Sequence, residues 1–190
     1  EVSDCEIIVI MRERTPFTKS LFARLPKLKI LITSGMRNAS IDLAAASARG
    51  VVVCGTASSS GPPTELTWAL ILGLARGIVQ ENTTLRSNGA WQSTVGSDLK
   101  GKQLGLLGLG KIGSDVAKIG TAFGMKTVAW SPNLTKDRAD AACVHLVSSK
   151  QELLETSDFV SIHLVLSEST KGILRGGDLK RMKPSAYLIN

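Results

Sequence analysis

Three glycines with the spacing G-x-G-x-x-G, Gly108, Gly110 and Gly113, are the residues of this sequence whose pattern implies the most specific chemistry. The first glycine permits a tight turn, the second lets a pyrophosphate approach the backbone, and the third lets a helix pack closely on a strand. A helix that begins here directs unpaired N–H groups and the positive end of its dipole at the phosphates. The pattern predicts dinucleotide binding; the alternative is a glycine-rich corner without a ligand.

The segments on either side of these glycines supply the context that the motif requires. Gln103–Leu107 is predicted to be a buried strand, and Gly124 stands where the C-terminal glycine of a helix is expected. Between them lies one apolar helical face, with spacings of four, three and four positions: Ile112, Val116, Ile119 and Phe123. The order strand, loop, helix therefore supports a dinucleotide site.

Length and composition indicate a globular protein with one domain and part of a second. Of the 190 residues, 43% are hydrophobic and 21% charged, which is typical of a chain that buries a core. No apolar run reaches the roughly 18 residues needed to cross a bilayer, and the acidic first residues do not have the pattern of a signal peptide, so we predict no membrane partner. The net charge of +7 is spread along the chain and only 4% of residues are aromatic, which favours an anionic cofactor and substrate over nucleic acid.

The cysteines indicate the redox environment. Cys5, Cys54 and Cys143 are odd in number, far apart and without a C-x-x-C pattern. This argues against a disulfide framework and against a zinc site, and it predicts a cytoplasmic protein without a metal.

Strands and helices alternate in two series, which predicts an α/β fold with parallel sheets. The first series comprises the strands Glu6–Ile10, Leu28–Thr33 and Val51–Cys54 and the helices Thr18–Leu25 and Ile41–Arg49. The second comprises the strands Gln103–Leu107, Lys126–Trp130, Val144–Val147, Asp158–His163 and Tyr187–Asn190 and the helices Ile112–Phe123, Thr135–Ala141, Lys150–Glu155 and Gly177–Met182. Ser40 is predicted to cap Ile41–Arg49, and Ser149 with Glu152 to form a capping box. Five strands with short helices predict most of a doubly wound sheet.

A turn-rich segment, Ser58–Pro63, predicts a boundary between a domain of residues 1–60 and one of residues 61–190. The helix that follows, Thr64 to about Gln80 with Leu85 as an alternative end, has apolar side chains on nearly every side, which indicates burial all round. We therefore expect this helix to lie between two domains or two subunits, and we predict a homodimer.

Several ordered blocks resemble the D-isomer-specific 2-hydroxyacid dehydrogenases, which include phosphoglycerate dehydrogenase and hydroxypyruvate or glyoxylate reductases. The blocks are Ile41–Ala46, Gly50–Val53, Pro63–Thr67, Asp98–Gly105, the glycine loop through Met125, and Met182–Pro184 leading into Leu188–Asn190. The resemblance implies a Rossmann NAD(P)-binding domain, incomplete at its C-terminus, and part of a flavodoxin-like substrate domain. It also implies an oxidoreductase that moves a hydride between NAD(P)H and a small D-2-hydroxy acid or 2-keto acid. The alternative is a non-enzymatic NAD(H)-sensing protein that binds partners, as do corepressors with this fold.

The resemblance also assigns site residues. Lys111, Ile112 and Leu164 are expected at the cofactor with the three glycines, and Thr67 is a candidate for facing the nicotinamide. The loop Gly35–Asn38, which comprises Gly35, Met36, Arg37 and Asn38, matches the segment whose backbone amides hold the substrate carboxylate. A small residue is usual at the position of Arg37. Its guanidinium either grips a carboxylate or points to solvent.

Two departures from the family pattern affect the expected chemistry. NAD-preferring members have an acidic residue about 20 residues beyond the glycine loop, where this sequence has Ser131 and Asn133. These side chains can bond a ribose or a 2′-phosphate, and the cofactor is therefore NAD(H) or NADP(H). The family's catalytic arginine, its acidic partner and its catalytic histidine come after the strand that ends at Asn190. No catalytic residue is therefore predicted within the chain, and His163 is interpreted as a packing residue.

Overall fold

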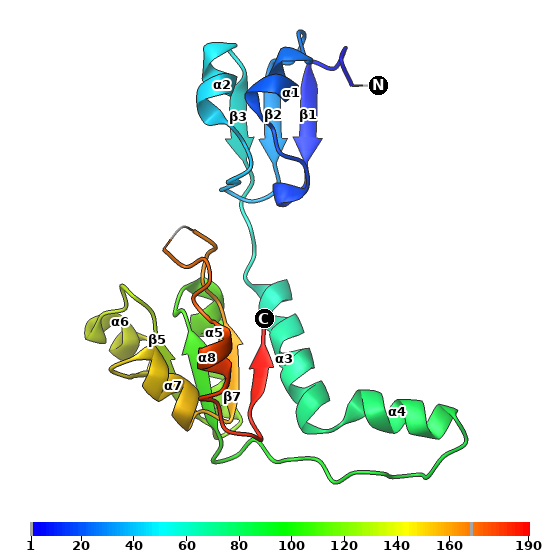
Figure 1. Cartoon of the computed structure of the whole chain (residues 1–190), viewed down its shortest axis with the longest axis vertical. Helices are drawn as coiled ribbons and strands as arrows, with labels where there is room; N and C mark the ends of the chain where they lie inside the picture. The colour runs from blue at the N-terminus through cyan, green and yellow to red at the C-terminus, as the bar shows by residue number, and fades with distance from the viewer. Residues whose placement is uncertain (1, 168) are drawn as a thin grey trace. The chain divides into compact units, whose positions relative to one another are not determined.

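The computed structural model describes residues 2–167 and 169–190, which form two compact units that meet at Ser59 and Ser60. Each unit is built on its own parallel sheet (Figure 1). Among the described residues, no helix combines the length and the apolar character needed to cross a membrane.

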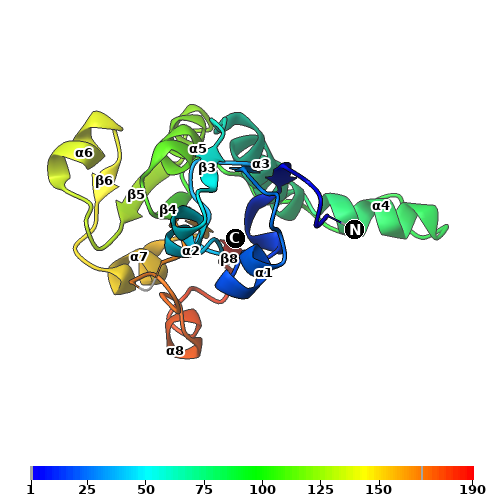
Figure 2. The same ribbon diagram turned by 90° about the horizontal axis from the view of Figure 1, so that it is seen from above.

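The first unit is a three-stranded parallel sheet in the order β1-β2-β3. The strands are β1 (Ile7–Ile10), β2 (Ile30–Thr33) and β3 (Val52–Gly55), accompanied by the 3-10 helix η1 (Arg12–Arg14) and the helices α1 (Lys19–Ala23) and α2 (Leu43–Ala48). Both ribbon views show α1 and α2 on one face of the sheet (Figures 1 and 2). There Phe22, Leu31 and Ala46 form the centre of a buried cluster. The loops that follow the three strands lie at one edge, because the strands are parallel.

The start of α2 differs from the prediction. Asp42, not Ser40, is its N-cap residue, and the Asp42 carboxylate accepts a hydrogen bond of 2.8 Å from the Ala45 N–H. The Ser40 hydroxyl lies 2.6 Å from Asn38 Oδ1. The prediction of Ser40 as the cap is wrong because that hydroxyl is used by the preceding loop.

The second unit contains a five-stranded parallel sheet in the order β6-β5-β4-β7-β8, which confirms the doubly wound fold. Its strands are β4 (Gln103–Leu107), β5 (Lys126–Trp130), β6 (His145–Leu146), β7 (Phe159–Ile162) and β8 (Tyr187–Ile189). Its helices are α3 (Gly61–Ala75), α4 (Ile78–Arg86), α5 (Lys111–Ala122), α6 (Lys136–Ala141), α7 (Lys150–Thr156) and α8 (Gly176–Leu179). The direction of winding reverses between β4 and β7.

Helices cover both faces of this sheet, and the side chains of β4 alternate between them. Figure 2 shows α3 and α5 on one side and α7 and α8 on the other. Leu104 and Leu106 belong to the buried cluster that includes Trp68 and Val116, whereas Leu107 belongs to the cluster around the α7 leucines. A strand buried on both faces reads as a nearly continuous apolar run, which is why β4 was predictable.

The buried face of α5 is predicted only in part. Val116 is buried and Ile112 is half-buried, as expected. Ile119 and Phe123, however, are 36% and 42% exposed, and the helix also buries small residues: Gly113, Ala117 and Gly120. A Cβ at Gly120 would lie 2.9 Å from Leu104 Cδ2. The helix approaches the sheet so closely that only small side chains fit on its inner face.

The single helix predicted for Thr64–Gln80 is two helices. α3 ends at Ala75 and α4 begins at Ile78, with Gly77 between them in the left-handed region at φ 62°. Glu81 on α4 then holds the segment that returns from α4, since its carboxylate accepts bonds from the Ser93 and Thr94 N–H groups and hydroxyls. The hydrogen bond from the Thr94 side chain is the largest of the causes that lower the pKa of Glu81 to about 2.

The predicted cap of α7 is confirmed in part. Ser149 accepts a hydrogen bond of 3.1 Å from the Glu152 N–H. The Glu152 carboxylate bonds the N–H of Ser148 rather than that of Ser149, at 2.9 Å. The box therefore closes one residue earlier than predicted.

Candidate functional site

The glycine loop lies at the carboxyl end of β4, and the space around each glycine explains in a different way why a glycine stands there. Gly108 is buried, has φ 102°, and a Cβ there would lie 2.7 Å from the His163 carbonyl oxygen. A Cβ at Gly113 would collide with the Gly108 carbonyl oxygen. At Gly110, by contrast, an added Cβ would meet no atom within 4 Å. The loop therefore has a tight turn, a close helix contact and an open surface between them, which fits a pyrophosphate at Gly110.

The helix α5 begins at this open surface beside Gly110. Gly110 is the N-cap residue and provides no side-chain cap. The first N–H groups of a helix have no partner within the helix, so they are suited to an anion. Lys111 is exposed and Ile112 is partly buried in this first turn. The Ser60 hydroxyl bonds Asp115 and lowers its pKa, which ties the start of α3 to α5.

The loop after β7 lies beside the glycine loop, at the point where the winding reverses. A Cβ at Gly108 would lie 3.0 Å from Leu164 Cδ2, so the Leu164 side chain contacts this turn. The His163 ring nitrogen Nε2 lies 2.9 Å from Ser161 Oγ. Burial lowers the pKa of His163, which keeps the ring neutral at pH 7. These contacts agree with the interpretation of His163 as a packing residue.

Thr67, the predicted nicotinamide contact, is largely buried in the structure. Its side chain is 7% exposed, and its hydroxyl donates a hydrogen bond of 2.7 Å to the Pro63 carbonyl oxygen within α3. The hydroxyl is therefore already paired, and contact between Thr67 and the nicotinamide stays a prediction.

A pocket of about 360 Å³ lies at the carboxyl ends of β5 and β6. It is lined by Trp130, Ser131, Pro132, Leu134, Leu146, Val147 and Ser148. No lining residue is acidic. Ser131 lines the pocket, but Asn133 does not, and the Asn133 carbonyl instead accepts a bond of 3.5 Å from Arg138 Nη1. Lys136 is paired with Asp140 at 2.6 Å.

In the first unit, the loop Gly35–Asn38 is held by the Asn38 side chain. Its Nδ2 donates to the Arg12 carbonyl at 2.7 Å and lies 3.0 Å from Thr33 Oγ1. Gly35 is buried at φ 96°, while Met36 is 69% exposed and Arg37 is exposed. The loop is thus fixed at both ends, and its central residues face outward.

Comparison with known proteins decides the family. Residues 68–190 match the NAD-binding domain of the D-isomer specific 2-hydroxyacid dehydrogenases. The chain belongs to this family. The match also confirms the predicted nicotinamide dinucleotide domain. The chain is 33% identical over 193 residues to D-3-phosphoglycerate dehydrogenase of Methanocaldococcus jannaschii, which covers 100% of this chain and 36% of that protein.

Solved structures agree with this assignment. Phosphoglycerate oxidoreductase from Vibrio cholerae is 34% identical with a TM-score of 0.89, covering 96% of this chain and 59% of that chain. D-Lactate dehydrogenase from Aquifex aeolicus, solved with NAD and lactic acid, is 28% identical with a TM-score of 0.82, covering 100% of this chain and 57% of that one. The chain therefore spans only part of the length of these relatives.

Two features of the site were missed by sequence reasoning. Leu146, Val147 and Ser148 line the pocket with Ser131, and the rule that ligands lie beyond the carboxyl ends of strands could have found them. Arg12 lies against the loop Gly35–Asn38, and no local pattern marks it. Within the described residues, no group of three His, Cys, Asp or Glu side chains is arranged to hold a metal ion.

Proposed function

We propose that the protein containing this chain is an oxidoreductase that transfers a hydride between NAD(P)H and a small D-2-hydroxy acid or 2-keto acid. The observation that carries the proposal is the open glycine loop at the reversal between β4 and β7, within residues that match the NAD-binding domain of this family. The substrates in the names of its relatives, phosphoglycerate and lactate, are small 2-hydroxy acids. They support this function over that of a non-enzymatic NAD(H) sensor.

The chain's own residues position the cofactor in this proposal. Gly108–Gly113, including Lys111 and Ile112, hold the pyrophosphate at the start of α5. The pocket beside Ser131 receives the adenosine, with Asn133 at its exposed margin. Leu164 packs beside the turn, and Thr67 lies on the nicotinamide side. When bound, the nicotinamide supplies or accepts the hydride.

Residues 1–60 serve as part of the substrate domain and residues 61–190 as the cofactor domain. Within the loop Gly35–Asn38, the N–H groups of Met36 and Arg37 bind the substrate carboxylate and so orient C2 for hydride transfer, while the Gly35 N–H donates to Thr56 Oγ1 at 3.0 Å and fixes the loop. We assign no acid–base role to any residue of this chain. The proton donor and the cation at the substrate carbonyl are proposed to follow Asn190 in the full-length protein.

We further propose a homodimer formed through α3 and α4. Leu66, Leu70 and Leu74 recur every four residues on α3 and are 62%, 42% and 43% exposed. Ile78 and Val79 at the start of α4 are 55% and 76% exposed. An apolar stripe of this kind is typical of a protein interface. Cys5, Cys54 and Cys143 are free thiols, which supports a cytoplasmic location.

The test is turnover by the full-length protein. NADH and NADPH oxidation would be followed with glyoxylate, hydroxypyruvate and pyruvate, and we expect reduction of at least one of them. A variant with Gly110→Val should lose most cofactor affinity. Tight NAD(H) binding with no turnover of any 2-keto acid would favour the sensor instead.

A further inference from the structure

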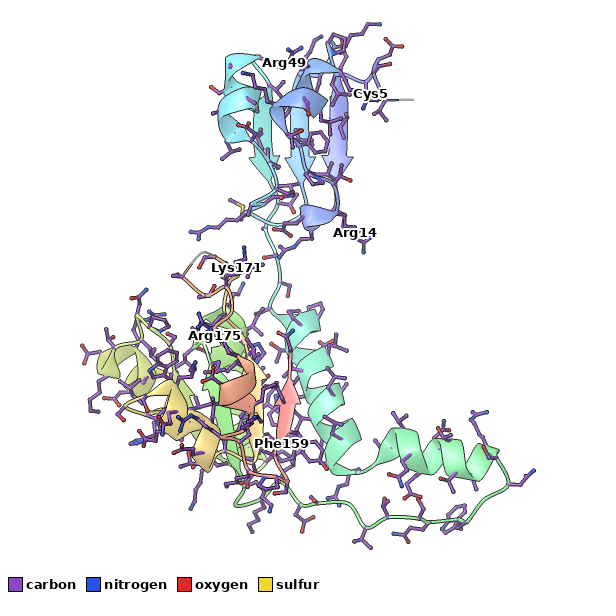
Figure 3. The ribbon with its side chains drawn as sticks, viewed as in Figure 1. Cys5, Arg14, Arg49, Phe159, Lys171 and Arg175 are labelled. Carbon is purple, nitrogen blue, oxygen red and sulfur yellow. The ribbon has the colours of Figure 1, made fainter. Side chains whose placement is uncertain are left out.

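His163 lies against two glycines of the dinucleotide loop, although it follows β7 and the loop follows β4. β7 begins at Phe159, which is labelled in Figure 3, and ends at the edge of the sheet where the glycine loop lies. The His163 N–H donates a hydrogen bond of 2.8 Å to the carbonyl oxygen of Leu107, the last residue of β4. A Cβ at Gly108 would lie 2.7 Å from the His163 carbonyl oxygen, and a Cβ at Gly113 would lie 3.6 Å from His163 Cβ. One residue therefore contacts both the turn after β4 and the first turn of α5.

The chain beyond His163 leaves the glycine loop quickly. The Leu164 side chain contacts the turn, but Val165 and Leu166 are 71% and 77% exposed. The contact between this segment and the glycines therefore depends on His163 and Leu164.

The His163 ring is anchored by the strand that precedes it. Its Nε2 lies 2.9 Å from the Oγ of Ser161, two positions earlier in the chain. Ser161 is fully buried and is paired in register with Leu106, whose side chain belongs to the buried cluster beside α3 and α5. Among residues 2–167 and 169–190, His163 is the one hydrogen-bond partner of the Ser161 hydroxyl. Because a buried hydroxyl without a partner is costly, the two side chains depend on each other.

The hydrogen bond uses the ring nitrogen that is farther from the backbone. The nearer nitrogen, Nδ1, has no hydrogen-bond partner in the described part of the chain. A neutral imidazole has one donor and one acceptor nitrogen, and a hydroxyl can pair with either. Another side chain at position 163 would thus restore the bond only if it carried a polar group at the reach of Nε2.

We infer that Ser161 and His163 are positioning residues for dinucleotide binding, with the Ser161 hydroxyl holding the His163 ring and the ring holding the segment that supports the glycine loop. This inference rests on the proposed function, in which Gly108–Gly113 hold the pyrophosphate. Anchoring of the ring keeps the His163 carbonyl against the turn and its Cβ against the start of α5. The loop is then preformed at the spacing that the pyrophosphate needs, and less free energy is lost on binding. A side chain that only filled space would not need the hydroxyl.

The binding test uses the full-length protein that contains this chain, and fluorescence titration measures its affinities for NADH and NADPH. Ser161→Ala and His163→Leu should each weaken both affinities about tenfold, since each removes one partner of a buried hydrogen bond. His163→Gln should stay within about threefold of the wild type, because its amide reaches the position of Nε2 and can pair with Ser161. His163→Asn, whose amide reaches only the position of Nδ1, should lose as much affinity as His163→Leu.

Steady-state kinetics with a 2-keto acid that the wild type reduces give a second readout. In Ser161→Ala the KM for the cofactor should rise about tenfold, while kcat at saturating cofactor should stay close to that of the wild type. The reason is that the pair supports the loop and is not assigned to the reacting atoms. The double variant of Ser161→Ala and His163→Leu should lose no more affinity than either single variant, because both remove the same hydrogen bond.

His145→Gln is the matched control, since His145 is the other histidine of the sequence and is exposed on β6. Its affinity for both cofactors should not change. Thermal unfolding without cofactor establishes which variants are folded. If His163→Leu is not, the contrast between His163→Gln and His163→Asn carries the test.

The outcomes separate this inference from the proposed function. Wild-type affinity in folded Ser161→Ala, or equal affinities in His163→Gln and His163→Asn, would overturn the positioning role and leave the proposed function standing. A wild type that binds NADH or NADPH, whose variants show the expected pattern, but that reduces no 2-keto acid would refute the proposed function alone.

Discussion

Gly110 and Gly113 differ in what surrounds them, and this predicts two distinct mutant phenotypes. At Gly113 an added methyl group would collide with the Gly108 carbonyl oxygen and lie 3.6 Å from His163 Cβ. The nearest atom belongs to the backbone of the turn, so either the turn or α5 must move. Overpacking of this kind costs about 1–3 kcal/mol, and the better helix propensity of alanine offsets at most about 1 kcal/mol.

Gly113→Ala should therefore destabilise the second unit by about 1–2 kcal/mol, a decrease in Tm of several degrees. It should also weaken dinucleotide binding, because the displaced turn carries Gly108. Gly110→Ala adds the same methyl group to open space, with no atom within 4 Å. Its stability should not change, but its affinity should fall about tenfold, or 1.4 kcal/mol, since the methyl group occupies the approach of the phosphates.

Thermal unfolding without cofactor and fluorescence titration with NADH and NADPH measure the two effects separately. The expected pattern is loss of both stability and affinity in Gly113→Ala, and loss of affinity alone in Gly110→Ala. A Gly113→Ala protein as stable as the wild type would show that the turn yields freely and would refute the packing argument. Unchanged affinity in Gly110→Ala would place the pyrophosphate elsewhere.

Three further predictions follow from single contacts. Ser131→Asp should lower NADPH affinity at least tenfold relative to NADH, because a carboxylate in the acid-free pocket repels a 2′-phosphate; titration of both cofactors checks it, and an unchanged ratio would contradict it. Glu81→Gln should speed hydrogen exchange at the Ser93 and Thr94 amides, and equal exchange in both proteins would count against this prediction. In the wild type, the hydrogen bonds from these amides to the Glu81 carboxylate should be intact at pH 7. They should weaken as the pH falls below 4.5 towards the lowered pKa of about 2, because protonation removes the carboxylate that accepts them. If the proposed homodimer forms through α3 and α4, Leu70→Asp should convert it to a monomer in analytical ultracentrifugation, whereas Lys118→Asp, on an exposed part of α5, should not.

The parts of the fold that were predictable are those whose signal is local. β4 reads as a continuous apolar run because both of its faces are buried, and the helix cap at Ser149 lies within three positions of its partner N–H. The break at Gly77 has no such local signal, because a lone glycine is tolerated within a helix. Whether such a glycine ends the helix depends on how the following segment packs, and here the Thr94 hydroxyl lies beside Gly77.

The face of α5 illustrates a second limit. An apolar pattern gives weight to Ile119 and Phe123 and none to glycine, so it identifies the larger side chains as the core. The structure buries Gly113 and Gly120 because the helix lies against β4 at a distance that excludes larger groups. Hydrophobic periodicity therefore located the helix correctly but could not determine how closely it packs.

The two candidate sites share a structural feature that the residues around Gly35 and Gly108 do not reveal by themselves. In each unit a glycine with positive φ follows a central strand, Gly35 at 96° after β2 and Gly108 at 102° after β4. Each glycine is covered by the loop from a neighbouring parallel strand, by Arg12 in the first unit and by the His163 carbonyl in the second. The covering groups differ in charge: in the first unit a guanidinium lies beside the proposed substrate loop, while in the second a carbonyl closes the turn next to the proposed pyrophosphate site at Gly110. Arg12 is 23 positions from Gly35, and only the parallel order β1-β2-β3 brings the two together. In the sequence alone, Arg12 is one charged residue in a polar turn, and its contact with Gly35 depends on the register of the sheet.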